Sequence, residues 1–164
     1  MKYTLAILVE NHAGVLSKVA ALFSRRGFNI DSLSVGVTED TKLSRMTVVV
    51  DCDKNTIEQV EKQLNKLIDT VKVKVLPEGG YLARELTLVK ISCPVKQRAE
   101  MMKTAELMNA HIIDVTATTV TLEFTDTSER TEIFLTMLRP FGIRELVRTG
   151  VSAIEKGVQT ARKE

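Results

Sequence analysis

Few residues of this chain could carry out covalent chemistry. The two histidines, His12 and His111, are the candidates for a general base. His12 lies where a strand pattern gives way to a helix pattern, a place where solvated histidines outnumber catalytic ones, and His111 begins an apolar segment typical of an edge strand. Histidines, cysteines and carboxylates lack metal-ligand spacing, and the glycines form no phosphate-binding motif. The sequence therefore predicts neither a catalytic residue nor a metal site.

One loop instead has the residues to bind a small molecule. Residues 10–14, Glu-Asn-His-Ala-Gly, precede a predicted helix whose first N–H groups and partial positive charge would attract a carboxylate. Gly14 lets such a ligand approach the backbone, and the side-chain oxygens of Asn11 and Asn29 could accept hydrogen bonds from an ammonium group. Together these groups suit the two ends of an amino acid. Composition alone favours a simpler interpretation, in which Asn11 and Gly14 form a turn and Asn29 begins a strand.

The elements that position this loop follow the order β-α-β-β-α-β. Apolar residues alternate in the four strand segments and recur at helical spacing in the two helix segments. These segments are residues 4–9, 15–27, 28–37, 43–52, 55–68 and 71–75. Asn55, followed three residues later by Glu58, resembles a capping box at the start of the second helix.

The same order repeats after the midpoint of the chain, where residues 77–80 form its only cluster of proline and glycine. The repeated segments are residues 86–91, 99–108, 112–115, 120–124, 128–138 and 143–147. Twofold repetition predicts an α+β fold of two consecutive ferredoxin-like βαββαβ domains, each an antiparallel sheet with helices on one face. We place the domains at residues 1–76 and 84–157, with a linker at 77–83 and a polar tail at 158–164.

The face of the first sheet opposite its helices is predicted to be apolar. Leu8, Val35 and Val49 are assigned to it. An apolar sheet face exposed to water is an association site, so we expect an oligomer.

Composition excludes several classes of partner. The 164 residues include 23 Lys and Arg against 21 Asp and Glu, a net charge of +2, which gives no electrostatic footprint for nucleic acid or an anionic membrane. Aromatic residues make up 4% and tryptophan is absent, so stacking on bases is disfavoured. The chain has no long apolar run and no signal-peptide pattern, and its two cysteines lie singly in apolar segments. We expect a cytoplasmic protein.

Several motifs resemble a known family. Residues 8–16, 23–33 and 43–47 are similar to the ACT domain of the small, regulatory subunit of acetolactate synthase (acetohydroxyacid synthase). Residues 84–91, 112–116 and 148–150 resemble the second domain of the same family. The resemblance extends from about Tyr3 to Gly157.

The resemblance implies a non-catalytic subunit that functions in branched-chain amino acid biosynthesis. Such a subunit binds the large catalytic subunit, raises its activity and confers feedback inhibition by a branched-chain amino acid, usually valine. This chain would hold no cofactor, whereas thiamine diphosphate, Mg²⁺ and FAD are expected on the catalytic partner.

The resemblance also implies the residues of an effector site. Asn11, Gly14, Val15 and Leu16 would form the effector loop of the first domain, which is also expected to form the homodimer. Asn29 and Ile30 would come from the neighbouring domain across the dimer interface. Val15, Leu16 and Ile30 would line a small apolar pocket for the effector side chain.

Two alternatives to a regulatory subunit belong to other functional classes. A free-standing ACT-type amino-acid sensor would carry the same loop but regulate a different enzyme. A small enzyme on a ferredoxin-like scaffold would need a catalytic role for His12 or a carboxylate.

Overall fold

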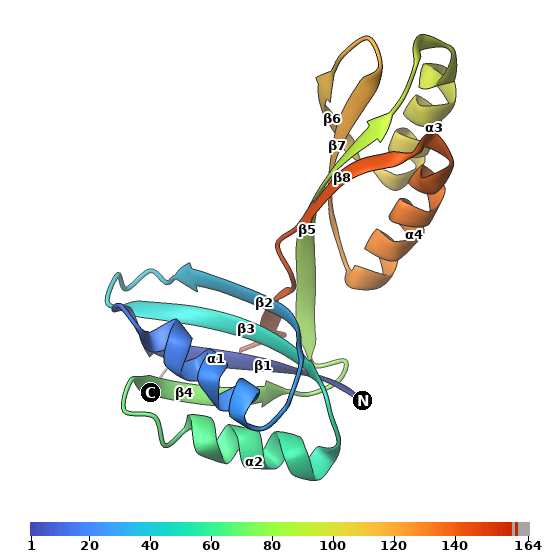
Figure 1. The fold of residues 1–164 in the computed structure, drawn as a ribbon. Helices are drawn as coiled ribbons and strands as arrows, with labels where there is room; N and C mark the ends of the chain where they lie inside the picture. The colour runs from blue at the N-terminus through green and yellow to red at the C-terminus, as the bar shows by residue number, and fades with distance from the viewer. Residues whose placement is uncertain (159, 161–164) are drawn as a thin grey trace. The chain divides into compact units, whose positions relative to one another are not determined.

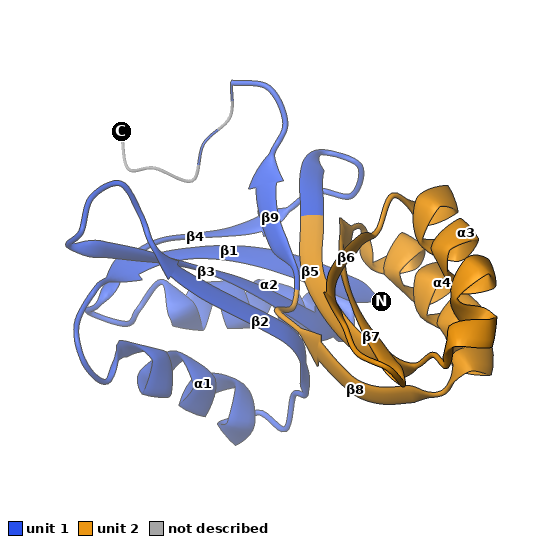
Figure 2. Ribbon diagram, turned by 90° about the horizontal axis from the view of Figure 1, so that it is seen from above, with its two compact units in different colours: residues 1–83, 151–164 blue, residues 84–150 orange. Residues whose placement is uncertain are grey.

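The chain folds into two compact units. A computed structural model describes residues 1–158 and 160. The first unit comprises Met1–Ala83 together with Val151–Glu164, and the second comprises Arg84–Gly150 (Figure 2). Within the described residues, no helix is long and apolar enough to cross a membrane.

In the first unit, two helices cover one face of a four-stranded antiparallel sheet (Figure 1). The elements are β1 (Lys2–Glu10), α1 (Val15–Arg25), β2 (Ile30–Val37), β3 (Leu43–Asp51), α2 (Lys54–Leu64) and β4 (Thr70–Leu76). The strand order is β2-β3-β1-β4, which makes β1 and β3 central and leaves β2 and β4 at the edges.

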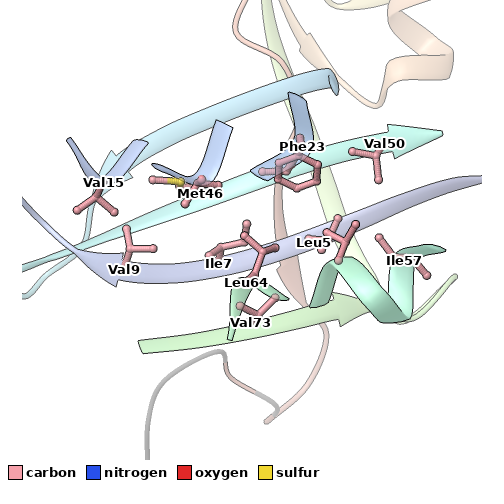
Figure 3. Packing of buried hydrophobic residues seen from close by; sticks show 13 residues of the cluster. Leu5, Ile7, Val9, Val15, Phe23, Met46, Val50, Ile57, Leu64 and Val73 are labelled. Atoms are coloured by element: carbon pink, nitrogen blue, oxygen red, sulfur yellow. The ribbon is translucent and has the colours of Figure 1, made fainter. Parts of the chain in front are cut away.

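The core of the first unit lies between the helices and the sheet (Figure 3). Every second residue of the central strands faces the helices, and one stripe of each helix faces the sheet. The core side chains are Leu5, Ile7, Val9, Val15, Val19, Phe23, Met46, Val48, Val50, Ile57, Val60, Leu64 and Val73. The alternation of the first strand and the stripe of the first helix, both predicted from the sequence, are confirmed.

The start of α2 differs from the predicted capping box. Asp53 is the N-cap, and its carboxylate accepts a hydrogen bond from the Thr56 backbone N–H at 2.9 Å. Asn55 lies inside the helix. Two capping patterns overlap in this sequence, and the carboxylate prevails because its charge also interacts favourably with the positive end of the helix.

The second unit repeats the same order of elements. Its elements are most of β5 (Tyr81–Ser92), the 3₁₀ turn η1 (Val95–Gln97), α3 (Arg98–Met108), β6 (His111–Val115), β7 (Thr119–Asp126), α4 (Ser128–Leu138), η2 (Arg139–Phe141) and β8 (Ile143–Arg148). The strand order β6-β7-β5-β8 matches that of the first sheet, and β9 (Ser152–Glu155) adds to β5. The predicted pair of βαββαβ domains is confirmed.

The boundaries between the units differ from those that we placed from the sequence. Of the expected linker, residues 77–80 form a turn in which the Gly80 N–H donates to the Pro77 carbonyl, but Tyr81–Ala83 already belong to β5. Residues from Val151 onward belong to the first unit and not to the second. The expected polar tail falls largely outside the described residues.

A small cluster on the open face of the first sheet accounts for these boundaries. Ala6, Leu76 and Ala153 are buried there, and Tyr81, Ala83 and Val151 pack against them. Burying these apolar side chains holds both chain segments on the first sheet.

The C-terminal segment, residues 151–156, lies on the sheet face that we expected to be free. Polar side chains of β2 and β3 satisfy its backbone: the Val151 N–H donates to Ser32 Oγ at 2.7 Å, and Arg45 Nη2 donates to the Ala153 carbonyl at 2.7 Å. The carboxylate of Glu155, which is 6% exposed, pairs with Lys74 Nζ at 2.8 Å. The segment thus covers its own sheet by specific contacts.

The expected apolar association surface is therefore wrong in its location. Leu8 and Val49 are buried within the first unit. Val35 pairs with Met46, a core residue on the helix side, so its side chain lies on that side of the sheet. Val35 is 46% exposed there because β2 is an edge strand.

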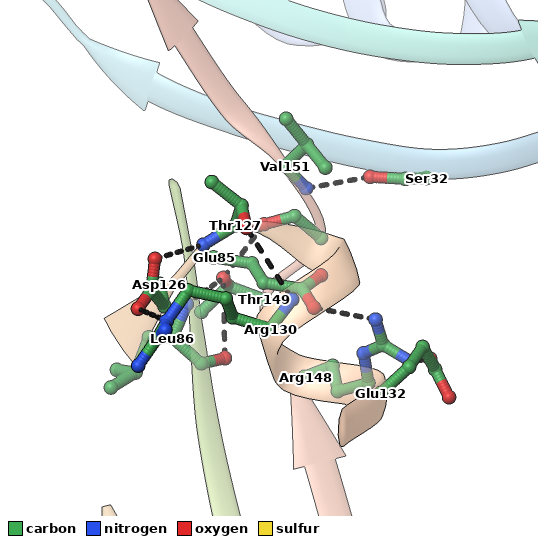
Figure 4. A network of polar contacts seen from close by, with 11 residues as sticks. Ser32, Glu85, Leu86, Asp126, Thr127, Arg130, Glu132, Arg148, Thr149 and Val151 are labelled. Carbon is green, nitrogen blue, oxygen red and sulfur yellow. Dashed lines mark hydrogen bonds and ion pairs between the residues drawn. The ribbon is translucent and has the colours of Figure 1, made fainter. Parts of the chain in front are cut away.

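A buried ion pair ties together three elements of the second unit (Figure 4). The guanidinium of Arg148 on β8 binds Glu85 on β5 and Glu132 on α4. The Glu85 side chain is 3% exposed, whereas the Glu132 side chain is 58% exposed. The two carboxylates raise the pKa of Arg148 against the lowering effect of its burial. Glu85 therefore depends on this guanidinium for its charge compensation.

We expect Arg148→Met to lower the free energy of unfolding of the second unit by about 3 kcal/mol, because the buried Glu85 carboxylate would lose its charged partner. Hydrogen exchange of the β5 and β8 amides would measure the loss. The matched variant Glu132→Gln removes only the exposed partner and should cost less than about 1 kcal/mol. Equal losses in the two variants would contradict the importance of the buried pair.

Candidate functional site

The loop between β1 and α1 is fixed by backbone hydrogen bonds at its start. The Glu10 N–H donates to the Asp69 carbonyl at 2.9 Å, and the Asn11 N–H donates to the Lys42 carbonyl at 2.7 Å. The chain then turns into α1 at Gly14, which has a φ of +88°. This left-handed conformation favours glycine, so the tight entry into the helix depends on this residue.

The amino terminus of α1 is open. Gly14 is the N-cap residue and makes no side-chain cap, and the first turn contains no acidic residue. A Cβ added to Gly14 would meet no atom within 4 Å, so the space beside the helix terminus is accessible. Unpaired N–H groups and the helix dipole at such a place favour a bound carboxylate. Gly14 thus leaves the helix terminus uncovered, and its part in binding stays a prediction.

Asn11 is held by the hairpin that joins β2 and β3. Its Oδ1 accepts a hydrogen bond from Ser44 Oγ at 2.9 Å, and its Nδ2 donates to the Thr41 carbonyl at 2.9 Å. Through these bonds the Asn11 side chain attaches the β1–α1 loop to the hairpin. A carbonyl oxygen has two acceptor positions, so one of them remains for a ligand ammonium group.

The side chains of Val15 and Leu16 point to different surroundings. Val15 is 3% exposed, and its side chain belongs to the core of the first unit. Leu16 is 43% exposed beside the open helix terminus. The core stripe of α1 begins with Val15, and the expected pocket lined by both side chains stays a prediction.

Asn29 and Ile30 lie at the other end of α1. Asn29 is exposed, and Ile30 begins β2 and packs partly against the core. The 11 residues of α1 separate them from Gly14, a helix length of about 16 Å. Within one chain, the structure brings together Asn11, Gly14 and Leu16 but not Asn29 and Ile30.

A charged cluster that the sequence analysis did not identify lies against the loop. Asp69, just before β4, is 6% exposed, and its carboxylate contacts His12 Nε2 at 2.9 Å and Lys18 Nζ at 2.5 Å. Glu10 Oε2 lies 3.5 Å from the same histidine nitrogen. Asp69 follows His12 by 57 residues, so no local spacing could have revealed the contact.

Ion pairing is the chemistry that this cluster supports best. Ligand atoms of Glu10, His12 and Asp69 lie within 4.8 Å of one another, as a metal site would require. However, the Lys18 ammonium already occupies the second oxygen of Asp69. Hydrogen bonds from Lys18 and His12 lower the pKa of Asp69, which keeps its carboxylate ionised.

Comparisons with known proteins cover both units. The family model described as "AHAS small subunit-like ACT domain" matches residues 5–72, and the one described as "Small subunit of acetolactate synthase" matches residues 84–157. The chain is 46% identical over 157 residues to a probable acetolactate synthase small subunit of Archaeoglobus fulgidus, covering 96% of this chain and 98% of the relative. It is 42% identical over 163 residues to the acetolactate synthase isozyme 3 small subunit of Salmonella typhimurium, covering 99% and 100%.

A solved structure supports the same relationship. The crystal structure of an acetolactate synthase small subunit from Thermotoga maritima superposes with a TM-score of 0.88 at 38% identity. The match covers 96% of this chain and 98% of that chain.

The contribution of the Asn11 hydrogen bonds to stability can be tested without a ligand. We expect Asn11→Ala to lower the free energy of unfolding by about 1–2 kcal/mol, because two hydrogen bonds to the β2–β3 hairpin are lost. Ser44→Ala should remove one of them. Urea unfolding of wild type, the two single variants and the double variant completes a double-mutant cycle. Because both single variants lose the bond between Ser44 and Asn11, the double variant should lose less stability than the sum of the two single losses. Strictly additive losses would contradict a direct bond between the two side chains.

Proposed function

The chain belongs to the family of acetolactate synthase small subunits, and on this premise we propose that it binds the large catalytic subunit of an acetolactate synthase, raises its activity and confers feedback inhibition. The observation that carries the proposal is that both units match the family over nearly the full length of the chain. Thiamine diphosphate, Mg²⁺ and FAD would bind the catalytic partner.

The effector that we propose is a branched-chain amino acid, with L-valine as the first candidate. The open amino terminus of α1 beside Gly14 supports a site for its carboxylate. The free acceptor position of Asn11 Oδ1 and the exposed amide of Asn29 suit its ammonium group. Leu16 and Ile30 would contact its aliphatic side chain.

Each site would be completed by a second copy of the chain in a homodimer. β2 is an edge strand, and on its helix side Val35 and Val37 are 46% and 57% exposed. Unpaired backbone groups and exposed apolar side chains on one edge favour strand-to-strand association.

Antiparallel pairing of β2 with β2 of a second copy would place the start of one strand beside the end of the other. Asn29 directly precedes β2, Ile30 begins it, and its end leads into the hairpin that holds Asn11. This arrangement supports a site made from the loop of one copy and Asn29 of the other.

Reconstitution tests the regulatory function directly. We expect the purified chain to form no acetolactate from pyruvate, to raise the turnover of an added catalytic subunit, and to make that turnover sensitive to L-valine. L-Leucine, L-isoleucine and D-valine serve as comparisons for specificity. A chain that binds an amino acid but has no effect on any acetolactate synthase would instead be a free-standing sensor.

A charge at Gly14 should abolish effector binding. In Gly14→Asp, the new carboxylate occupies the place of the ligand carboxylate, and calorimetric titration with L-valine should show no binding. Gly14→Asn is the matched control, since asparagine has the same shape and also tolerates the left-handed conformation but carries no charge. Equal valine affinity in wild type and a folded Gly14→Asp protein would contradict the assignment.

Gly14→Asp, combined with a variant of Asn29, can also test whether each site is shared between two chains. Asn29→Ala should weaken valine binding by about 1–3 kcal/mol, because the ligand ammonium group would lose its hydrogen-bond acceptor. In a mixed dimer of Gly14→Asp and Asn29→Ala chains, one site carries both defects and the other is intact. We expect half of the sites to bind with wild-type affinity, whereas sites confined to single chains would give none.

A further inference from the structure

His12 makes two hydrogen bonds that only its charged form can satisfy. Its Nδ1 lies 3.1 Å from the Ala13 carbonyl oxygen, and its Nε2 lies 2.9 Å from Asp69 Oδ1. A carbonyl oxygen and an ionised carboxylate both accept hydrogen bonds and cannot donate them. A neutral imidazole has one N–H, so it can make either bond but not both. The geometry therefore specifies an imidazolium with a proton on each nitrogen.

These two bonds join the effector loop to the body of the first unit. The carbonyl of Ala13 and the N–H of Gly14 belong to one planar peptide group, so the bond from His12 fixes the direction of that N–H. On its other side, His12 is anchored by Asp69, whose own backbone carbonyl holds the end of β1. Asp69 also binds Lys18 in the second turn of α1.

We propose that His12 and Asp69 are positioning residues of the amino-acid site, and that binding of the effector is stronger when His12 is protonated. The inference rests on the proposed function, because it concerns the same loop. When His12 loses its proton, one of its two bonds is lost, and the peptide group before Gly14 is freed from the anchor.

The charges around the loop favour the same direction. Three charged groups surround His12: Glu10 from β1 and Asp69 lie against its ring, and Lys18 from α1 binds Asp69. Two carboxylates are balanced by two cations when His12 is protonated, and they exceed the cations by one when it is neutral. An incoming ligand carboxylate therefore meets a less negative loop when His12 carries its proton.

The local hydrogen bonds also shift the titration of His12 to higher pH. The Ala13 carbonyl and then the Asp69 carboxylate raise the pKa of His12 above its ordinary value, against a lowering effect of desolvation. A raised pKa means that the bonded form is complete at low pH and is lost as the pH rises through the pKa of the folded protein.

Calorimetric titration with L-valine tests the proposal on the full-length protein. We expect the dissociation constant of wild type to rise about three- to tenfold between about pH 6 and about pH 8.5, and binding near the midpoint to take up a fraction of a proton. Proton uptake is measured by repeating the titration in buffers of different ionisation enthalpy. In His12→Gln, the uptake should vanish and the pH dependence should flatten.

His111→Gln is the matched control, because it removes the other histidine, which lies at the start of β6 in the second unit. It should retain the pH dependence and proton uptake of wild type. The amino group of valine also titrates, but it affects all variants equally. Comparing wild type with His12→Gln therefore removes the contribution of the ligand to the pH dependence.

Two measurements on the unliganded chain test the anchor itself. NMR titration of the His12 ring should give a lower pKa in Asp69→Asn than in wild type, because the carboxylate is replaced by an uncharged amide. Hydrogen exchange of the Glu10 and Lys18 amides, which are bonded to the Asp69 and Gly14 carbonyls, should be faster in His12→Gln. The His12 side chain is 47% exposed, so this variant should keep the unit folded.

The outcomes separate this inference from the proposed function. Absence of binding by L-valine, L-leucine and L-isoleucine at either pH would overturn the effector site and, with it, the role of His12. Valine binding that is independent of pH in wild type, or equally dependent on pH in His12→Gln, would overturn only the role of His12.

Discussion

The carboxylate of Asp69 is the point on which the geometry of the candidate site depends. It is buried at the end of the loop before β4, and it binds one side chain from the β1–α1 loop and one from α1. Its backbone carbonyl receives the last N–H of β1. A buried carboxylate without cations would be costly, so His12 and Lys18 must stay close to it. The open amino terminus of α1 is therefore held in place by charge compensation behind the loop.

A second constraint comes from the C-terminal segment. Residues 151–156 return to the first sheet, where side chains of β2 and β3 form hydrogen bonds with their backbone. The chain thus enters and leaves the second unit from the first, at Ala83 and at Val151. This segment covers the open face, whereas Val35 and Val37 stay exposed at the free edge of β2.

Local patterns were sufficient for most of the secondary structure. The helical stripe that begins at Val15 and the alternation of β1 depend on neighbours within a few residues, and both are present. Gly14 was identified as the entry to a helix because only a few residue types allow such a turn. The cap of α2 was missed because Asp53 and Asn55 are both suitable and lie two residues apart.

The sequence by itself determined the family, the repeated βαββαβ order and the loop from Asn11 to Leu16, since each depends on residues that are close together in the chain. Tertiary structure alone decided that Asp69 lies behind His12 and that residues 151–156 cover the first sheet. These contacts join segments 57 to 119 residues apart. Such pairs leave no periodic signal, because burial and charge compensation select them only after the sheet has formed.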